Sequence, residues 1–170
     1  YIPDANFEGR LIQLGYDNGS INGWVLTDNI KGVTSLNFSN SNSGYNISDL
    51  TGIEDFIGLT VLDCSYNPIT NLDVSGAINL DSLRCYDVPL ALINLNNNLR
   101  SFTLNSSSSQ FTSLNLSNCL NLEFLQLDNS STTNLDVSNN TALSYLVTNC
   151  PLTSLDLSNN TALRKLQCSG

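Results

Sequence analysis

The stretch "LDVSNNTALSYL" (135–146) returns twenty positions later as "LDLSNNTALRKL" (155–166), and the two copies differ chiefly just before the last leucine. This pair belongs to a longer series of similar units. The units begin at Leu59, Leu80, Leu99, Leu122, Leu143 and Leu163, and the unit from Leu80 is the shortest and the unit from Leu99 the longest. A period of about 20 residues indicates a repeat array in which each repeat is one structural unit.

Each repeat contains one short pattern twice, namely an apolar residue followed by two more, three and five positions later. The first complete repeat places them at Leu59, Leu62 and Cys64, and again at Ile69, Leu72 and Val74. The apolar-x-apolar part is typical of a short strand with alternating faces. Such strands are unstable alone, so we expect repeats to stack with equivalent triplets paired as parallel strands about 4.8 Å apart. The sequence predicts a solenoid of short parallel strands and loops.

The segment "LTVLDCSYNPITNLDVS" (59–75) matches the pattern L-x-x-L-x-L-x-x-N-x-L-x-x-L, with Cys64 and Ile69 as apolar substitutes. Over about residues 33–170 the chain therefore resembles bacterial leucine-rich repeat proteins, and more narrowly their nested class with a repeat of roughly 21 residues. The stretch "ISDLTGIEDFIGL" (47–59) also resembles internalin-type repeats. The resemblance implies a right-handed leucine-rich repeat solenoid.

The corners of the predicted coil are rich in Asn, Ser and Asp, whose short side chains satisfy backbone groups in tight turns. Counting from the repeat leucines assigns one corner to Asn67, Val88, Ser107, Ser130 and Pro151. The opposite corner is assigned to Asn98, Cys119, Asn140 and Asn160.

The segment before the array is different. In "IPDANFEGRLIQLGY" (2–16), Pro3 and Asp4 are start signals and Gly15 is a stop signal for a short amphipathic helix. Its apolar positions are Phe7, Leu11, Ile12 and Leu14. We expect residues 1–32 to form an N-terminal cap and residues 33–170 to form the array, with an irregular first turn over 33–58. The array stops in mid-repeat, so we expect it to continue in a longer parent chain with flanking domains.

Composition excludes several function classes. The net charge of −9 opposes nucleic acid, which needs clustered Lys and Arg. No apolar run approaches the roughly 18 residues of a membrane helix, so membrane insertion is not expected. The chain has no His, which rules out Ser-His and Cys-His nucleophile pairs. Its five cysteines have no zinc spacing, and Cys64, Cys85 and Cys168 fall at inward positions as buried free thiols.

Outward positions differ between the two halves of the repeat. In the second half the central position is always Asp or Asn, as in Asp73, Asp136 and Asp156, which indicates a structural role. In the first half the outward positions change from repeat to repeat, so they are free to fit a ligand. Aromatic side chains there supply rigid contact area. The predicted ligand-binding residues are Arg84, Tyr86, Phe124, Gln126, Asp128, Tyr145 and Lys165.

Competing sites are weaker. The aspartates of the second half could bind calcium, and "DNGSING" (17–23) is a turn too short for a calcium loop, so no metal or cofactor is predicted. A glycosidase would need two facing carboxylates, and the candidates are Asp63 with Asp128 or a pair from the aspartates of the second half.

The sequence therefore favours a non-catalytic recognition or adhesion module that binds a protein or polysaccharide through the variable strand face. The resemblance implies a bacterial secreted or cell-surface protein. The alternatives are a structural spacer in a large adhesin and a carboxylate-based glycan hydrolase.

Overall fold

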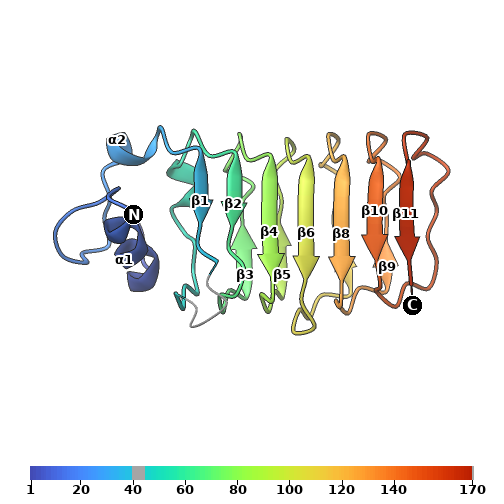
Figure 1. Cartoon of the computed structure of the whole chain (residues 1–170), viewed down its shortest axis with the longest axis horizontal. Helices are drawn as coiled ribbons and strands as arrows, with labels where there is room; N and C mark the ends of the chain where they lie inside the picture. Colours follow the sequence, from blue (N-terminus) through green and yellow to red (C-terminus); the bar gives the residue numbers. More distant parts are fainter. Residues whose placement is uncertain (40–44, 170) are drawn as a thin grey trace.

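The computed structural model describes residues 1–39 and 45–169, and its repeats stack along one axis, with the N-terminal helices at one end (Figure 1). Residues 40–44 of the predicted first turn and Gly170 of the predicted array lie outside the described residues. Each turn of the coil places one strand beside its equivalent in the next turn. The architecture is the predicted solenoid.

A long parallel sheet forms one side of the solenoid and is built from the first halves of the repeats (Figure 1). Its strands follow in the order β1 (Ser35–Asn37), β2 (Val61–Asp63), β4 (Ser82–Tyr86), β6 (Ser101–Asn105), β8 (Phe124–Asp128), β10 (Tyr145–Thr148) and β11 (Lys165–Cys168). The repeat leucines face each other in register, as Leu62 does with Leu83 and Leu125 with Leu146. This register keeps equivalent side chains in rows across the sheet.

The second halves of the repeats form shorter strands behind the main sheet (Figure 1). Strand β3 (Asn71–Asp73) pairs with β5 (Leu92–Asn94), and β7 (Ser113–Leu114) pairs with β9 (Asn134–Leu135), all in parallel. Strand β7 belongs to the longest repeat, which begins at Leu99, and the break between β5 and β7 coincides with the extra residues of that repeat. Pairing on this side is therefore interrupted, whereas the main sheet is continuous.

The core consists of rows of buried apolar side chains between the two sides of the coil. One row holds Leu36, Leu62, Leu83, Phe102, Leu125 and Leu146, which are all fully buried. Burying one leucine side chain contributes about 1.5–3 kcal/mol, so stacked rows supply the stability that such short strands lack. The rows are less covered in the last turn, where Leu166 of β11 is 48% exposed.

All five cysteines are free thiols, which confirms this prediction for Cys64, Cys85 and Cys168. Cys64 and Cys85 occupy neighbouring rungs of one buried row, with their Sγ atoms 3.5 Å apart. Burial raises the pKa of the Cys85 thiol, and the neighbouring Cys64 adds to this effect. Cys168 was predicted to be buried but is exposed, because no further turn covers β11 within the described residues.

The N-terminal segment contains helix α1 (Ala5–Gln13) and the short helix α2 (Thr27–Ile30). Asp4 caps α1 because its Oδ1 accepts hydrogen bonds from the backbone N–H groups of Asn6 (2.8 Å) and Phe7 (2.9 Å). The helix ends before the last apolar position of the predicted pattern, so Leu14 is exposed and not part of the buried face. Gly15 follows with φ +77°, a left-handed conformation that glycine tolerates and that stops the helix.

Helix α1 covers the first turn of the coil. The ring of Phe7 lies edge-on to that of Phe38, at 5.3 Å between centroids, and stacks near that of Phe56, at 6.2 Å. Phe56 follows the 3-10 helix η1 (Ile53–Asp55) in the irregular first turn. This packing matches a capping role, while the division of the chain at residue 32 stays a prediction.

Three corner assignments made by counting from the leucines are wrong, one each in the longest repeat, the shortest repeat and the repeat from Leu143. In the repeat from Leu143, Pro151 is exposed, whereas Cys150 is buried and its Sγ donates to the carbonyl of Leu127 (3.1 Å). At the first corner, Ser107 is exposed, and Ser109 is buried with its Oγ donating to the carbonyl of Val88 (2.9 Å). At the opposite corner, Asn98 is exposed, whereas Asn96 is buried and donates to the carbonyl of Ala77 (2.6 Å). Insertions and deletions shift the buried corner residue.

Candidate ligand-binding face

The outward side chains of the main sheet form three rows in strict register. We call this surface the strand face. The first row runs through Ser82, Ser101, Phe124, Tyr145 and Lys165. The second row runs through Asp63, Arg84, Thr103, Gln126 and Val147. The third row contains Tyr86, Asn105 and Asp128. All seven sequence-predicted residues therefore lie on one surface.

Three of these residues come together on neighbouring strands. Phe124 of β8 pairs in register with Tyr145 of β10, and Tyr145 pairs with Lys165 of β11. The rings of Phe124 and Tyr145 lie 6.4 Å apart between centroids, tilted by 33°. Phe124 is half-buried and Tyr145 is 42% exposed. The pair offers apolar contact area on a rigid support, beside a positive charge.

Polar groups adjoin this aromatic pair on β8. The side chain of Gln126 donates from Nε2 to Oδ2 of Asp128 at 2.6 Å. Both residues are half-buried. This hydrogen bond fixes the orientation of the Gln126 amide, whose carbonyl oxygen stays available as an acceptor. The residues Phe124, Gln126 and Asp128 thus form one ordered strip along a single strand.

Arg84 and Tyr86 form a separate group on β4. Strand β6 lies between β4 and β8 and carries smaller side chains, Ser101, Thr103 and Asn105. Thr103 is almost fully buried, since Arg84 and Gln126 flank it in register on both sides. The strand face therefore has two groups of longer side chains with a lower strip between them.

Tyr66 is a candidate that the sequence pattern missed. It follows β2, is 42% exposed, and its backbone N–H donates to the carbonyl of Tyr86 at 2.7 Å. Its φ of +61° is left-handed, which is unusual for a bulky residue. The equivalent positions after β4 and β8 hold Asp87 (φ +51°) and Asn129 (φ +55°), residue types that tolerate this conformation. Tyr66 therefore places an aromatic side chain at this corner, next to the strand that carries Tyr86.

The aspartates of the second half serve their own turns. Oδ1 of Asp73 accepts from the Oγ (2.6 Å) and backbone N–H (2.9 Å) of Ser75. Asp136 and Asp156 accept in the same way from the backbone of Ser138 and Ser158. Hydrogen bonds from these serines lower the pKa of all three carboxyl groups. The uniformity of this position therefore has a local structural cause.

These contacts also bear on the calcium alternative. No group of three or more Cys, Asp or Glu side chains within residues 1–39 and 45–169 is arranged to hold a metal ion. In "DNGSING" (17–23) the backbone N–H groups of Asn22 and Gly23 donate to the carboxylate of Glu8, at 2.7 and 2.8 Å. That segment is a turn held by a buried side chain.

The candidate hydrolase pair does not assemble. Asp63 lies on β2 and Asp128 on β8, three strand steps apart. At about 4.8 Å per step their separation is roughly 14 Å, beyond the span of about 5–10 Å that glycosidases use. Asp136 and Asp156 lie closer, on successive turns, but both have lowered pKa values, whereas a general acid needs a raised one.

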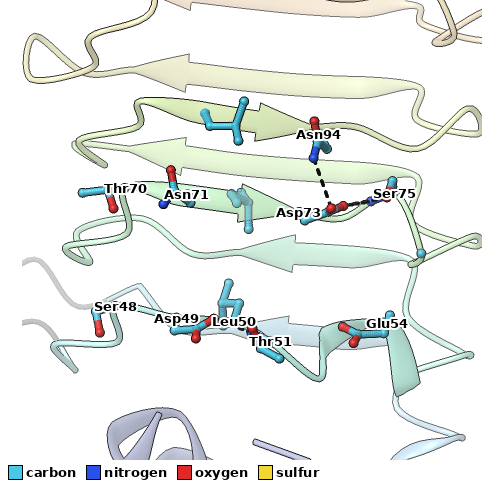
Figure 2. A pocket seen from close by; sticks show the side chains of 13 residues that line it. Ser48, Asp49, Leu50, Thr51, Glu54, Thr70, Asn71, Asp73, Ser75 and Asn94 are labelled. Atoms are coloured by element: carbon cyan, nitrogen blue, oxygen red, sulfur yellow. Dashed lines mark hydrogen bonds between the residues drawn. The ribbon is translucent and has the colours of Figure 1, made fainter. Parts of the chain in front are cut away.

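A hollow of about 700 Å³ lies on the other side of the solenoid, between the irregular first turn and strands β3 and β5 (Figure 2). Its carboxylates are Asp49, Glu54 and Asp73. Asp49 accepts from Thr51, Glu54 from the backbone of Gly52, and Asp73 from Ser75 and Asn94. Each of these carboxylates is therefore hydrogen-bonded within the chain, and none of the seven residues predicted from the sequence lines the hollow.

Comparison with known proteins supports the class of protein. The chain is 36% identical over 75 residues to internalin J of Listeria monocytogenes serotype 4b (strain F2365). The aligned segment covers 44% of this chain and 8% of internalin J. A solved structure of the functional domain of internalin J from Listeria monocytogenes, which includes a cysteine ladder, matches 98% of this chain and 41% of that chain, with a TM-score of 0.67 and 27% identity.

A second solved structure, an internalin of Listeria monocytogenes strain 4b F2365, covers 81% of this chain and 48% of that chain, with a TM-score of 0.60. Its identity of 17% supports the fold alone. No protein-family model matches the sequence.

The fold is that of a leucine-rich repeat solenoid, and the matches are to bacterial leucine-rich repeat proteins. Within that class the chain is internalin-like, as its repeats predicted. The chain spans less than half the length of each of these relatives. Among the described residues, no helix is long and apolar enough to cross a membrane.

Proposed function

We propose that this chain is a non-catalytic recognition module that binds a protein partner through the strand face. The observation that carries the proposal is the register of the main sheet, which gathers Phe124, Tyr145 and Lys165 on successive strands. The strand face combines aromatic area, fixed polar groups and charges of both signs. Interfaces of this composition concentrate their binding energy in a few aromatic and arginine side chains.

Rigidity is the physical advantage of this surface. Each strand of the face is hydrogen-bonded to its neighbours in register, and its inward side chains are packed in the core. A partner that binds there pays little for ordering the backbone. The aromatic anchors Tyr86, Phe124 and Tyr145 supply the contact area, while Arg84, Gln126, Asp128 and Lys165 supply directional contacts. Tyr66 extends the anchors beyond β2.

The similarity to internalins supports an inference about the class of partner and the location. We infer a bacterial secreted or cell-surface protein in which this module contributes to adhesion, with flanking domains in a longer parent chain. A protein partner is favoured over a polysaccharide because the anchors lie in two groups separated by β6, and the separation suits a broad contact. A polysaccharide is the second ligand class that aromatic side chains fit.

The test compares two triple variants of the whole chain on an array of purified host-surface and bacterial-surface proteins. One variant changes Tyr86, Phe124 and Tyr145 to alanine. The matched control changes three large exposed apolar residues outside the strand face, Ile57, Ile78 and Leu120. We expect saturable binding to a protein of the array, a loss of at least about tenfold in affinity for the first variant, and no change for the control.

The outcomes separate the alternatives. Equal losses for both variants, or a loss only for the control, would contradict the strand face as the binding surface. If the chain binds no protein of the array, the result would favour the alternative of a structural spacer. Release of reducing sugar from a glycan substrate would contradict a non-catalytic module.

A further inference from the structure

A second aromatic surface lies in the N-terminal segment, outside the main sheet. The side chains of Tyr1 and Trp24 are 57% and 64% exposed, yet their rings contact each other, with centroids 5.3 Å apart and planes tilted by 58°. We call this pair the cap platform. Exposed aromatic rings are costly to hydrate, so a paired set on the surface marks a candidate interaction site.

The backbone beneath Trp24 is held firmly. The preceding residues Asn22 and Gly23 donate their N–H groups to the two carboxylate oxygens of Glu8, whose side chain is fully buried. The carbonyl of Gly23 accepts from the N–H of Ile2 at 2.9 Å, which ties the two aromatic segments together. A buried carboxylate is thus used to fix the turn that presents the indole.

The backbone beneath Tyr1 is held equally firmly. Ile2 is buried in the core, and the carbonyl oxygen of Tyr1 packs so closely on Gly52 that a Cβ there would lie only 2.7 Å away. The Tyr1 ring also lies over Gly23, where a Cβ would be 3.5 Å from Cε2. Both rings therefore project from a prearranged support, which lowers the ordering cost of binding.

The chemistry of the cap platform fits a sugar. A pyranose presents a flat face of C–H groups with partial positive charge, and this face packs on the negative face of an aromatic ring. Two rings tilted by 58° can contact successive sugars of one chain, a geometry that a single planar ligand does not match. Residues 1–32 hold four carboxylates and two basic side chains, which disfavours an anionic glycan.

We propose that the cap platform binds a neutral, β-1,4-linked oligosaccharide, and that this site is separate from the strand face. Rotation about the glycosidic bond lets consecutive sugars of such a chain twist relative to each other, so that one sugar packs on Trp24 and the next on Tyr1. Asn22 lies beside the rings, and its Oδ1 accepts from the N–H of Trp24 at 2.9 Å, which orients the amide at the edge of the platform.

The test uses the fluorescence of Trp24, which is the single tryptophan of the chain. Cellohexaose and N-acetylchitohexaose are titrated into the full chain, with calorimetry as a second readout. We expect a saturable blue shift with one of these sugars, because a stacked sugar displaces water from the indole. Trp24→Ala and Tyr1→Ala should each weaken binding at least about tenfold, whereas Trp24→Phe should retain part of it.

Matched controls separate this site from the strand face. Tyr145→Ala removes an aromatic ring of comparable exposure there and should leave sugar binding unchanged. Thermal unfolding checks that the variants fold. If Trp24→Ala does not fold, the sugar affinities of Trp24→Phe and Tyr1→Ala test the proposal. The proposal is overturned if neither sugar gives a saturable signal up to about 10 mM. It is equally overturned if Trp24→Ala binds as tightly as the unchanged chain, or if these variants reduce only the binding of a protein.

Discussion

Replacing Asp4 with asparagine tests how the N-terminal segment is joined to the repeats. Oδ1 of Asp4 accepts from the first turn of α1, and Oδ2 accepts from the N–H (2.8 Å) and Oγ (2.8 Å) of Ser48 and from the N–H of Asp49 (3.1 Å). The carboxylate is buried. One side chain therefore caps a helix and holds the irregular first turn of the coil at the same time.

The magnitude follows from these contacts. Asparagine caps helices as well as aspartate does, so its Oδ1 keeps the bonds to α1. Its Nδ2 then replaces Oδ2 and faces the N–H groups of Ser48 and Asp49, which lose their acceptor. A hydrogen bond to a charged group contributes about 1.5–3 kcal/mol, and partial access of water reduces the loss of two such bonds to about 3 kcal/mol. For a chain of this length the unfolding temperature should fall by about 6–12 °C.

Two probes make the assay specific. Circular dichroism follows the whole solenoid, whereas Trp24 fluorescence follows the N-terminal segment alone. We expect the fluorescence transition of Asp4→Asn to precede the dichroism transition. The matched control is Asp136→Asn, because Asn115 already accepts from Ser117 at the equivalent position, and this variant should unfold at nearly the temperature of the unchanged chain. Coincident transitions near the temperature of the unchanged chain would refute the reasoning.

Three further measurements follow from the structure. Asn140→Ala should cost about 2–4 kcal/mol in unfolding free energy, because the carbonyls of Leu116 and Cys119 lose their buried donor; urea denaturation monitored by dichroism checks it. The folded chain has lowered carboxyl pKa values at Asp4, Asp73, Asp136 and Asp156, so the unfolded chain takes up protons first as the pH falls. The unfolding temperature should therefore be constant above about pH 5 and should decline below about pH 4. An unfolding temperature that stays constant down to about pH 2 would contradict this. Ellman's reagent should modify only the exposed Cys168 in the native chain and all five thiols in urea; rapid native modification of Cys85 would show that its row is open.

The array was predictable because its signal is repeated. Each repeat has a leucine or other apolar residue at the same distance from its start, so every repeat independently indicates a strand at the same place in the coil. The register of Leu62, Leu83 and Leu125 follows from these equal distances. Helix α1 was recognisable from Asp4 and Gly15, since each signal acts within its own turn. The strands of the array and helix α1 could be predicted because their signals lie within the segments that form them.

The wrong corner assignments occur in repeats that are longer or shorter than their neighbours. In those repeats, a residue counted from the preceding leucine no longer lies at the same place in the coil. In the shortest repeat the buried corner residue is Asn96 and not Asn98, and in the longest it is Ser109 and not Ser107. In the repeat from Leu143 it is Cys150 and not Pro151. A corner is defined by which side chain reaches the carbonyls of the preceding turn, and a small insertion or deletion moves that role to a neighbour. The exposure of Cys168 and Leu166 has a related cause, because burial in a solenoid depends on the next turn and not on the residue itself.

The candidate site could be predicted only as a surface. Variable outward positions indicated the strand face, but the pairing of Phe124 with Tyr145 and the bond from Gln126 to Asp128 depend on side-chain geometry. Tyr66 carried a signal that the pattern could have revealed, since its equivalents Asp87 and Asn129 are typical of a left-handed corner. The cap platform carried none, because Tyr1 and Trp24 are distant in sequence and only the folded turn at Gly23 brings them together.

A solenoid separates stability from recognition by the direction in which side chains point. Inward rows of leucine hold the turns together, and the Asp or Asn of each second half accepts from the backbone of its corner, so replacing either set with residues that cannot do so has a cost in stability. Outward residues of the main sheet carry little of this burden, and Phe124 and Tyr145 therefore occupy positions where other repeats have Ser82 and Ser101. Tyr66 departs from this separation, because its left-handed backbone costs about 1 kcal/mol or more that an asparagine would largely avoid. Changing Tyr66 to Asn should consequently weaken partner binding while the fold persists, and binding that is unchanged in this variant would remove Tyr66 from the strand-face site.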